Sequence, residues 1–150
     1  MITATRIKPY REVIPLDDGT NKLRINLHKG QQKAWQCLAR FPVILAGAQW
    51  GKTCLLPDWL NREMTTCGEG DYIVGSATFP VLGLKVLPEF TTLFCDLLRW
   101  GTYKDDRMGN RIIQSNTDKS RIIFFSATNP EAIESATAKA AILDEAGQKQ

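Results

Sequence analysis

Residue types that could bind phosphate and Mg²⁺ stand side by side at Gly51, Lys52 and Thr53. Residues 46–53 read AGAQWGKT, which is the pattern G-x-x-x-x-G-K-[ST] of a phosphate-binding loop with alanine in place of the first glycine. Small residues let successive backbone N–H groups turn inward around an anion. Alanine is small, so the loop can still bind phosphate with alanine in place of the first glycine. The alternative is a surface lysine after an ordinary turn. We name residues 46–53 the phosphate loop.

A phosphate loop needs a buried strand before it and a helix after it, and the flanking residues predict both. Residues 42–47 (PVILAG) are typical of a short buried strand, and residues 52–66 predict a helix in which Pro57 indicates a kink or a shorter first turn. The positive end of the helix dipole would face the phosphates. Trp50 could stack near the nucleotide or, as we favour, pack on the following helix. We expect the nucleotide to be bound by Gly47, Ala48, Gln49, Trp50, Gly51, Lys52 and Thr53.

Two acids follow another short apolar run, in the sequence AAILDEAG. Asp144 at the end of a buried parallel strand would help Thr53 to hold Mg²⁺, because the carboxyl ends of such strands meet at one edge of the sheet. Glu145 would then orient the attacking water as a general base, while Lys52 takes up developing negative charge. An exposed acidic turn is the alternative, and the phosphate loop earlier in the chain favours the catalytic interpretation.

The remaining elements alternate between strand and helix, which predicts an α/β fold with a mostly parallel sheet and helices on both faces. His28 is interpreted as part of a helix start and not as a catalytic group. The apolar stripe in the helix over residues 89–100 is interpreted as core. The polar turn at residues 115–120 predicts that the strands on either side of it form a hairpin. The expected helices cover residues 28–41, 89–100 and 129–135; the expected strands cover 22–26, 71–77, 111–114, 121–126 and 140–143; residues 79–83 are expected to be a loop.

Composition limits the class of protein. The 150 residues suit one domain, and the net charge of +3 arises because residues 1–40 carry eight Lys/Arg against three Asp/Glu. This basic arm could contact nucleic acid, or it could be a solvated leader with ordinary lysines. Four scattered cysteines predict free buried thiols in a reducing compartment. The N-terminus has no apolar signal core and the longest apolar run, residues 41–48, is too short to span a bilayer, so a soluble intracellular protein is expected.

Four stretches together resemble the N-terminal ATPase part of the large terminase subunit of tailed bacteriophages: LHKGQQKAW, LAGAQWGKT, YIVGSATFPVLGLKVLPEF and FFSATNPEAIESATAKAAILDEAG. The resemblance implies a P-loop NTPase fold of the additional-strand, RecA-like type, with residues 1–27 as a basic arm and 28–150 as a C-terminally incomplete ATPase domain. It implies ATP and Mg²⁺ as cofactors, and hydrolysis coupled to translocation of double-stranded DNA into a capsid. The implied partners are the DNA phosphate backbone, the portal protein, the small terminase subunit and further copies in a ring, in the host cytoplasm and with no membrane.

The resemblance also assigns residues individually. It implies adenine recognition by Gln31, with Gln32 as second choice, and a place near DNA for residues 76–80. The chain departs from the family at Ala48, where many members carry an arginine that acts as a finger on the γ-phosphate. A finger would then come from Arg107, Arg111 or Arg121 of a neighbouring subunit, or from sequence not present.

The chain is expected to lack a nuclease domain, and its own ATPase activity is expected to be weak or absent. Two other functions stay open. One is a different P-loop nucleic-acid motor, such as a helicase or remodeller, although Ala-Gly-Gln after Glu145 does not fit the helicase signature. The other is a catalytically silent fragment that binds a nucleotide or a partner.

Overall fold

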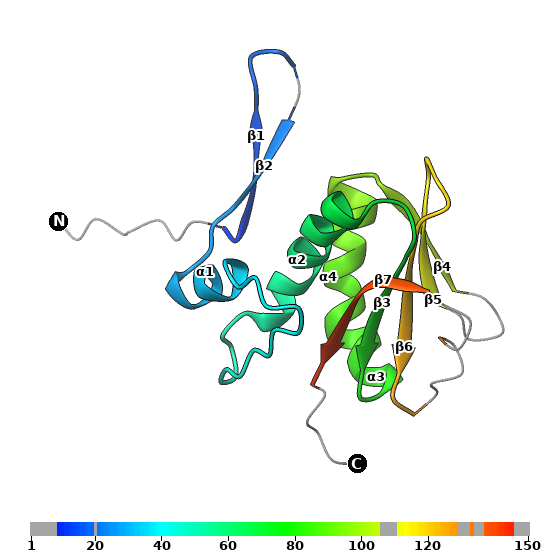
Figure 1. The fold of residues 1–150 in the computed structure, drawn as a ribbon. Helices are drawn as coiled ribbons and strands as arrows, with labels where there is room; N and C mark the ends of the chain where they lie inside the picture. The colour runs from blue at the N-terminus through cyan, green and yellow to red at the C-terminus, as the bar shows by residue number, and fades with distance from the viewer. Residues whose placement is uncertain (1–8, 20, 106–110, 129–132, 134–136, 146–150) are drawn as a thin grey trace. The chain divides into compact units, whose positions relative to one another are not determined.

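The computed structural model describes residues 9–19, 21–105, 111–128, 133 and 137–145 (Figure 1). The chain divides into two units, Met1–Gly47 and Ala48–Gln150. The expected domain boundary follows residue 27, whereas the structural division comes later and falls within the phosphate loop. Within the described ranges, no helix has the length and apolar character that crossing a bilayer requires.

The first unit contains a β-hairpin followed by a short helix. Strand β1 (Arg11–Pro15) pairs antiparallel with β2 (Asn21–Ile25), and α1 covers Lys29–Trp35. The turn between the strands places Gly19 at φ +81°, a conformation that glycine adopts without strain, and the Gly19 N–H donates to the Leu16 carbonyl at 3.0 Å. The expected strand over residues 22–26 is therefore present, and its partner β1 was not predicted.

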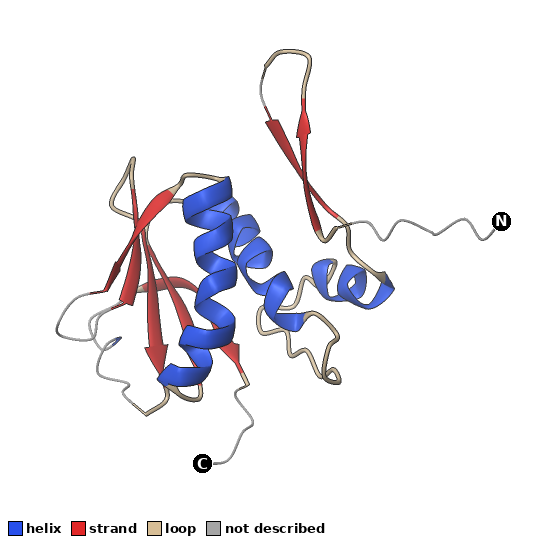
Figure 2. Ribbon diagram, turned by 180° about the vertical axis from the view of Figure 1, so that it is seen from behind, coloured by secondary structure: helices blue, strands red, loops and turns tan. Residues whose placement is uncertain are grey.

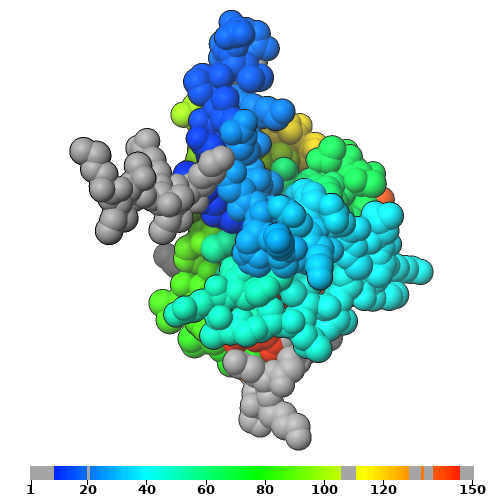
Figure 3. All heavy atoms as spheres, turned by 90° about the vertical axis from the view of Figure 1, so that its left-hand side faces the viewer, coloured from blue at the N-terminus to red at the C-terminus, as the bar shows by residue number. Residues whose placement is uncertain are grey.

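The segment between α1 and the phosphate loop corrects two expectations. The helix expected over residues 28–41 ends at Trp35, and residues 42–47 form no strand ladder. Leu38, Phe41, Val43 and Leu45 are 80–95% exposed, so the apolar pattern has no surface to pack against within the first unit. Figure 3 draws the atoms of this stretch in cyan. Short helices and strands depend on such packing, which explains why neither element extends here.

The second unit contains a five-stranded sheet with the strand order β4-β5-β6-β3-β7. The central strand β3 pairs parallel with β6 and with β7, whereas β4–β5 and β5–β6 are antiparallel. The sheet is therefore mixed, and the expectation of a mostly parallel sheet is wrong. The predicted hairpin of β5 and β6 is confirmed, and β4 was not predicted. The strands are β3 (Asp71–Ser76), β4 (Gly101–Asp105), β5 (Arg111–Ser115), β6 (Arg121–Ser126) and β7 (Ala138–Asp144).

The helices of the second unit lie along one side of this sheet in both ribbon views (Figures 1 and 2). The Phe90 ring of α4 meets the Phe124 ring of β6 edge-on, with centroids 5.5 Å apart. Helices on both faces are therefore not observed in the described part of the chain. The helical segments are α2 (Lys52–Cys67), α3 (Phe79–Val81), η1 (Leu82–Val86), α4 (Leu87–Thr91) and η2 (Thr92–Leu97).

Helical backbone runs from Phe79 to Leu97 without interruption, so the loop expected over residues 79–83 is helical. Thr78 caps its start by accepting a hydrogen bond from the Val81 N–H at 3.5 Å. Segments η1 and η2 have π-helical geometry; in η1 the Leu87 N–H reaches the Leu82 carbonyl, one residue further back than in an α-helix. This wider turn precedes Pro88, which has no N–H to donate, and lets the helix continue through it.

The core lies between these helices and the sheet. Phe90, Leu93 and Phe94 are fully buried, as the apolar stripe predicts, whereas Leu97 and Leu98 are exposed because the helix ends there. The four cysteines form no disulfide, as expected. Cys67 is exposed at the end of α2 and the other three are only half-buried, so the expectation that the thiols are buried is wrong. The helix expected over residues 129–135 falls outside the described residues except for residue 133.

Candidate functional site

The phosphate loop turns through two residues with left-handed backbone. Gln49 has φ +62° and Gly51 has φ +81°, and Gly51 is the N-cap of α2, whose first two residues are Lys52 and Thr53. Gly51 adopts this conformation at little cost, whereas for Gln49 the left-handed region costs on the order of 1 kcal/mol. The N-terminus of α2 therefore opens from a tight turn, with the positive end of its dipole on the loop side.

Residues 48–53 belong to the second unit, together with the two acids. Asp144 ends β7 with 8% of its surface exposed, and Glu145 follows it with φ +55°. Burial raises the pKa of the Asp144 carboxyl above its ordinary value, the charge of Glu145 raises it further, and the charges of Lys52 and Lys85 oppose the rise. Lys52 thus lies within electrostatic range of Asp144, which is the arrangement that the two motifs predict.

Polar side chains form a row across the ends of the three parallel strands. In the sheet register, Ser76 of β3 stands between Ser126 of β6 and Asp144 of β7, so the three side chains share the face that the helices cover. The Ser126 hydroxyl lies 2.8 Å from the Thr128 hydroxyl. The Ser76 hydroxyl is buried, at 4% exposure, and makes no hydrogen bond with any described residue. A buried hydroxyl without a partner is unfavourable, and such groups are concentrated at functional sites.

Lys85 of η1 also reaches this edge of the sheet, and the sequence analysis did not assign it. Its Nζ lies 3.7 Å from Oε1 of Glu145, and the two side chains are 61% and 24% exposed. Lysine is common on exposed helical turns, so the residue type alone does not indicate that Lys85 belongs to the site. Only the early start of the helix at Phe79, which Thr78 and Pro80 indicate, carries Lys85 to Glu145.

Gln31 lies in the first unit and is 97% buried in α1. Its Oε1 accepts a hydrogen bond from the His28 N–H at 3.2 Å, while His28 Nδ1 accepts from the N–H groups of Gly30 and Gln31. This reciprocal cap confirms the interpretation of His28 as a helix start. It gives the Gln31 oxygen a structural partner, and adenine recognition by Gln31 stays a prediction. Gly47 belongs to the first unit as well.

Two of the three candidate finger arginines have partners within the chain. Arg121 forms a bidentate ion pair with Asp71, in which Nε and Nη2 lie 2.8 and 2.6 Å from the two carboxylate oxygens. Arg111 Nε lies 3.4 Å from Oδ2 of Asp105, and its guanidinium lies over the Phe79 ring. Arg107 falls outside the described residues. An arginine supplied by a neighbouring subunit stays a prediction.

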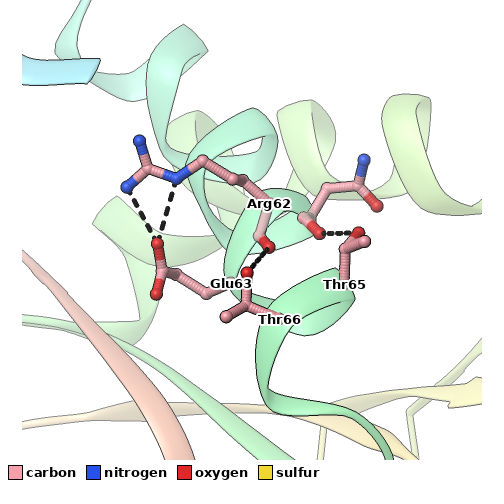
Figure 4. Close-up of polar contacts among 5 residues, drawn as sticks. Arg62, Glu63, Thr65 and Thr66 are labelled. Carbon is pink, nitrogen blue, oxygen red and sulfur yellow. Dashed lines mark hydrogen bonds and ion pairs between the residues drawn. The ribbon is translucent and has the colours of Figure 1, made fainter. Parts of the chain in front are cut away.

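The far end of α2 is held by contacts within the helix itself (Figure 4). Arg62 pairs with Glu63 at 2.8 Å, and the Thr65 and Thr66 hydroxyls donate to the carbonyls of Asn61 and Arg62 at 2.9 and 3.2 Å. This end of the helix is exposed, and its charged pair is engaged locally. The polar contacts at this end of α2 are therefore made within the helix.

The oxygen donors at the site suit a hard cation such as Mg²⁺. Asp144 offers a buried carboxylate and Thr53 a hydroxyl at the helix start, both of the ligand type that Mg²⁺ prefers. Within the described ranges, no group of three or more His, Cys, Asp or Glu side chains could hold a metal alone. Mg²⁺ with few protein ligands is usually bound together with substrate phosphates, so these residues fit a metal that arrives with a nucleotide.

Comparisons of the chain with models of protein families, with curated proteins and with solved structures find no match.

Proposed function

We propose that this chain is the ATP-binding and ATP-hydrolysing module of a viral DNA-packaging motor, the large terminase subunit. The observation that carries the proposal is that the charge of Lys52, at the first turn of α2, acts on the Asp144 carboxyl at the end of the parallel strand β7, directly before Glu145. A phosphate-binding helix start that faces a metal-binding acid is what phosphoryl transfer requires. Among proteins that carry out this chemistry, the resemblance of the four sequence stretches favours a terminase.

In the proposed mechanism, each residue has one role. Backbone N–H groups of residues 47–51 surround the phosphates, and Lys52 neutralises the two terminal ones. Thr53 and Asp144 would hold Mg²⁺, which would supply positive charge to the phosphate oxygens. Glu145 accepts the proton of the attacking water and orients that water in line with the γ-phosphate.

The proposed partner is double-stranded DNA, contacted through its phosphate backbone and therefore sensitive to salt and tolerant of sequence. Eight basic residues within the first forty support this contact. A portal protein, a small terminase subunit and a ring of identical subunits belong to the proposal through the resemblance alone. A helicase or remodeller would share the nucleotide chemistry and would differ in the DNA substrate that it moves.

A catalytically silent nucleotide-binding module is the second candidate, and one observation favours it. Residues 42–47 make no strand ladder, and the structural division falls between Gly47 and Ala48. A phosphate loop that is not anchored by a strand would hold phosphates less firmly, because its N–H groups are then less well preorganised.

The experiment is equilibrium binding of a fluorescent ATP analogue with Mg²⁺ to the chain, to Lys52→Ala and to the control Lys104→Ala. Lys104 lies on β4, at the opposite edge of the sheet from β7, and is exposed. We expect saturable binding that Lys52→Ala weakens at least about tenfold and that Lys104→Ala leaves unchanged, because a charge-assisted contact contributes about 1.5–3 kcal/mol. Absence of binding by the folded chain would refute the proposal, and binding without turnover would favour the silent module.

A further inference from the structure

The charges of two lysines act on the Asp144 carboxyl, and the proposed function uses only one of them. Lys52 belongs to the first turn of α2 and Lys85 to η1. Lys85 makes its ion pair with Glu145, the proposed general base, and not with Asp144. The base is therefore held by a cation in the nucleotide-free chain.

The backbone of Lys85 is held in place by buried neighbours, whereas its ammonium group can move. Leu82 and Val86, on the same π-helical segment, are fully buried. The Lys85 side chain itself is 61% exposed, and a pair of this exposure at 3.7 Å contributes little stability. Lysine has a long flexible stem with three donors, so a stronger anion can draw it away from Glu145. π-helical turns in helices often occur at functional positions, which agrees with this placement.

The charges at the site show what a terminal phosphate would meet. With Lys52 alone, one cation would face two carboxylates, and an incoming polyphosphate would meet net negative charge. With Lys85 the two lysines balance the two acids. The phosphate loop itself carries alanine at position 48 and no arginine, so it provides no second cation. The contact between its Nζ and Oε1 of Glu145 places Lys85 beside the acidic pair.

We propose that Lys85 is a second phosphate-binding lysine, which pairs with Glu145 in the nucleotide-free chain and contacts the terminal phosphate of a bound nucleoside triphosphate. The transfer releases Glu145 to orient water only when a third phosphate is present. This inference rests on the proposed function. It predicts selectivity for a triphosphate over a diphosphate, which Lys52 alone does not provide. A diphosphate would leave the Lys85–Glu145 pair intact.

The test is isothermal titration calorimetry of Mg²⁺-ATP and Mg²⁺-ADP with the wild-type chain and with Lys85→Ala, Lys85→Arg, Lys52→Ala and Lys104→Ala. We expect Lys85→Ala to weaken ATP binding about tenfold and ADP binding less than about twofold, as one charge-assisted contact predicts. Lys85→Arg should retain most of the ATP affinity, since it keeps the charge and the reach. Lys85 is exposed, so circular dichroism of its variants should match that of the wild type.

Equal losses for ATP and ADP, or no loss for either, would overturn the role of Lys85. If Lys52→Ala weakened both nucleotides in that case, the proposed function would stand without Lys85. If the wild-type chain bound neither nucleotide, the proposed function and this inference would fail together. A Lys85→Ala variant that lost affinity for duplex DNA alone would assign Lys85 to the DNA surface and would also overturn the proposal.

Discussion

The Ser76 hydroxyl is buried between Ser126 and Asp144 with no hydrogen-bond partner among the described residues. An unpaired buried hydroxyl costs about 1–3 kcal/mol of stability. Because removing it removes that cost, we expect Ser76→Ala to leave the free energy of unfolding unchanged or to raise it by about 1 kcal/mol. The matched variant Ser126→Ala, which loses the 2.8 Å contact with Thr128, should lower it by about 1 kcal/mol.

Urea unfolding of the two serine variants measures this difference. If Ser76 contacts a ligand of the site, Ser76→Ala should also weaken Mg²⁺-ATP binding although the chain is no less stable. A clear destabilisation by Ser76→Ala would show that its hydroxyl has a partner after all.

A pH dependence is expected at the turn between β5 and β6. The Ser120 N–H donates to Asp118 Oδ1 at 2.8 Å, and this hydrogen bond, with one from Ser115, lowers the pKa of the Asp118 carboxyl below its ordinary value of 3.8. A carboxyl with a lowered folded-state pKa stabilises the fold above its unfolded pKa, and that contribution is lost as the pH falls through the folded value. The stability difference between wild type and Asp118→Ala should therefore be largest near neutral pH and should shrink below pH 3.8. Urea unfolding at several pH values measures it, and a difference that grows towards acid would contradict the assignment.

At the scale of elements, the start of α2 depends on one backbone conformation. Gly51 has φ +81° at the N-cap, and a side chain in this left-handed region costs about 1–2 kcal/mol. We expect Gly51→Ala to lower the free energy of unfolding by about 1 kcal/mol, and Gly51→Asn by less, because asparagine tolerates the conformation better. Gly47→Ala is the matched control: an added Cβ there meets nothing within 4 Å and its φ is not left-handed.

Chemical denaturation of the two glycine variants measures the effect on folding, and Mg²⁺-ATP titration measures the effect on the loop. Equal destabilisation by Gly47→Ala and Gly51→Ala would mean that the left-handed turn is not what limits this position.

The elements that carry the site could be predicted where the local signal was strong. The apolar runs of β3 and β7, the helix after Gly51 and the polar turn of the β5–β6 hairpin all follow from sequence pattern alone. The extent of other elements could not be predicted, because packing decides it. Residues 42–47 have the composition of a buried strand, yet they form no strand ladder in the described chain. The helix expected over residues 89–100 begins earlier, at Phe79, because a π-helical turn carries the helix through Pro88.

The candidate site divides in the same way. The positions of Lys52 and Thr53 at a helix start, and of Asp144 and Glu145 at a strand end, could be predicted because motif and element agree, whereas their roles stay predictions. The position of Lys85 beside Glu145 could not be predicted, since it depends on where a helix passes and not on residue type. Gln31 was predicted for adenine, and the structure assigns its oxygen to a helix cap that the sequence H-K-G-Q also allows.

At the scale of the whole chain, the stretch between α1 and the phosphate loop is the most accessible apolar segment of those described. Phe41 is 80% exposed and Leu38 is 95% exposed, whereas Phe90 and Phe94 of the core are fully buried. We expect limited chymotrypsin digestion to cut first within residues 38–45, because proteases need exposed and locally unfolded backbone. The products should correspond to the two units, identified by mass spectrometry. Saturating Mg²⁺-ATP should slow this cut in the wild-type chain, since binding orders the neighbouring loop, and should not slow it in Lys52→Ala. First cuts within residues 71–97 would instead show that the sheet and its helices open before this segment does.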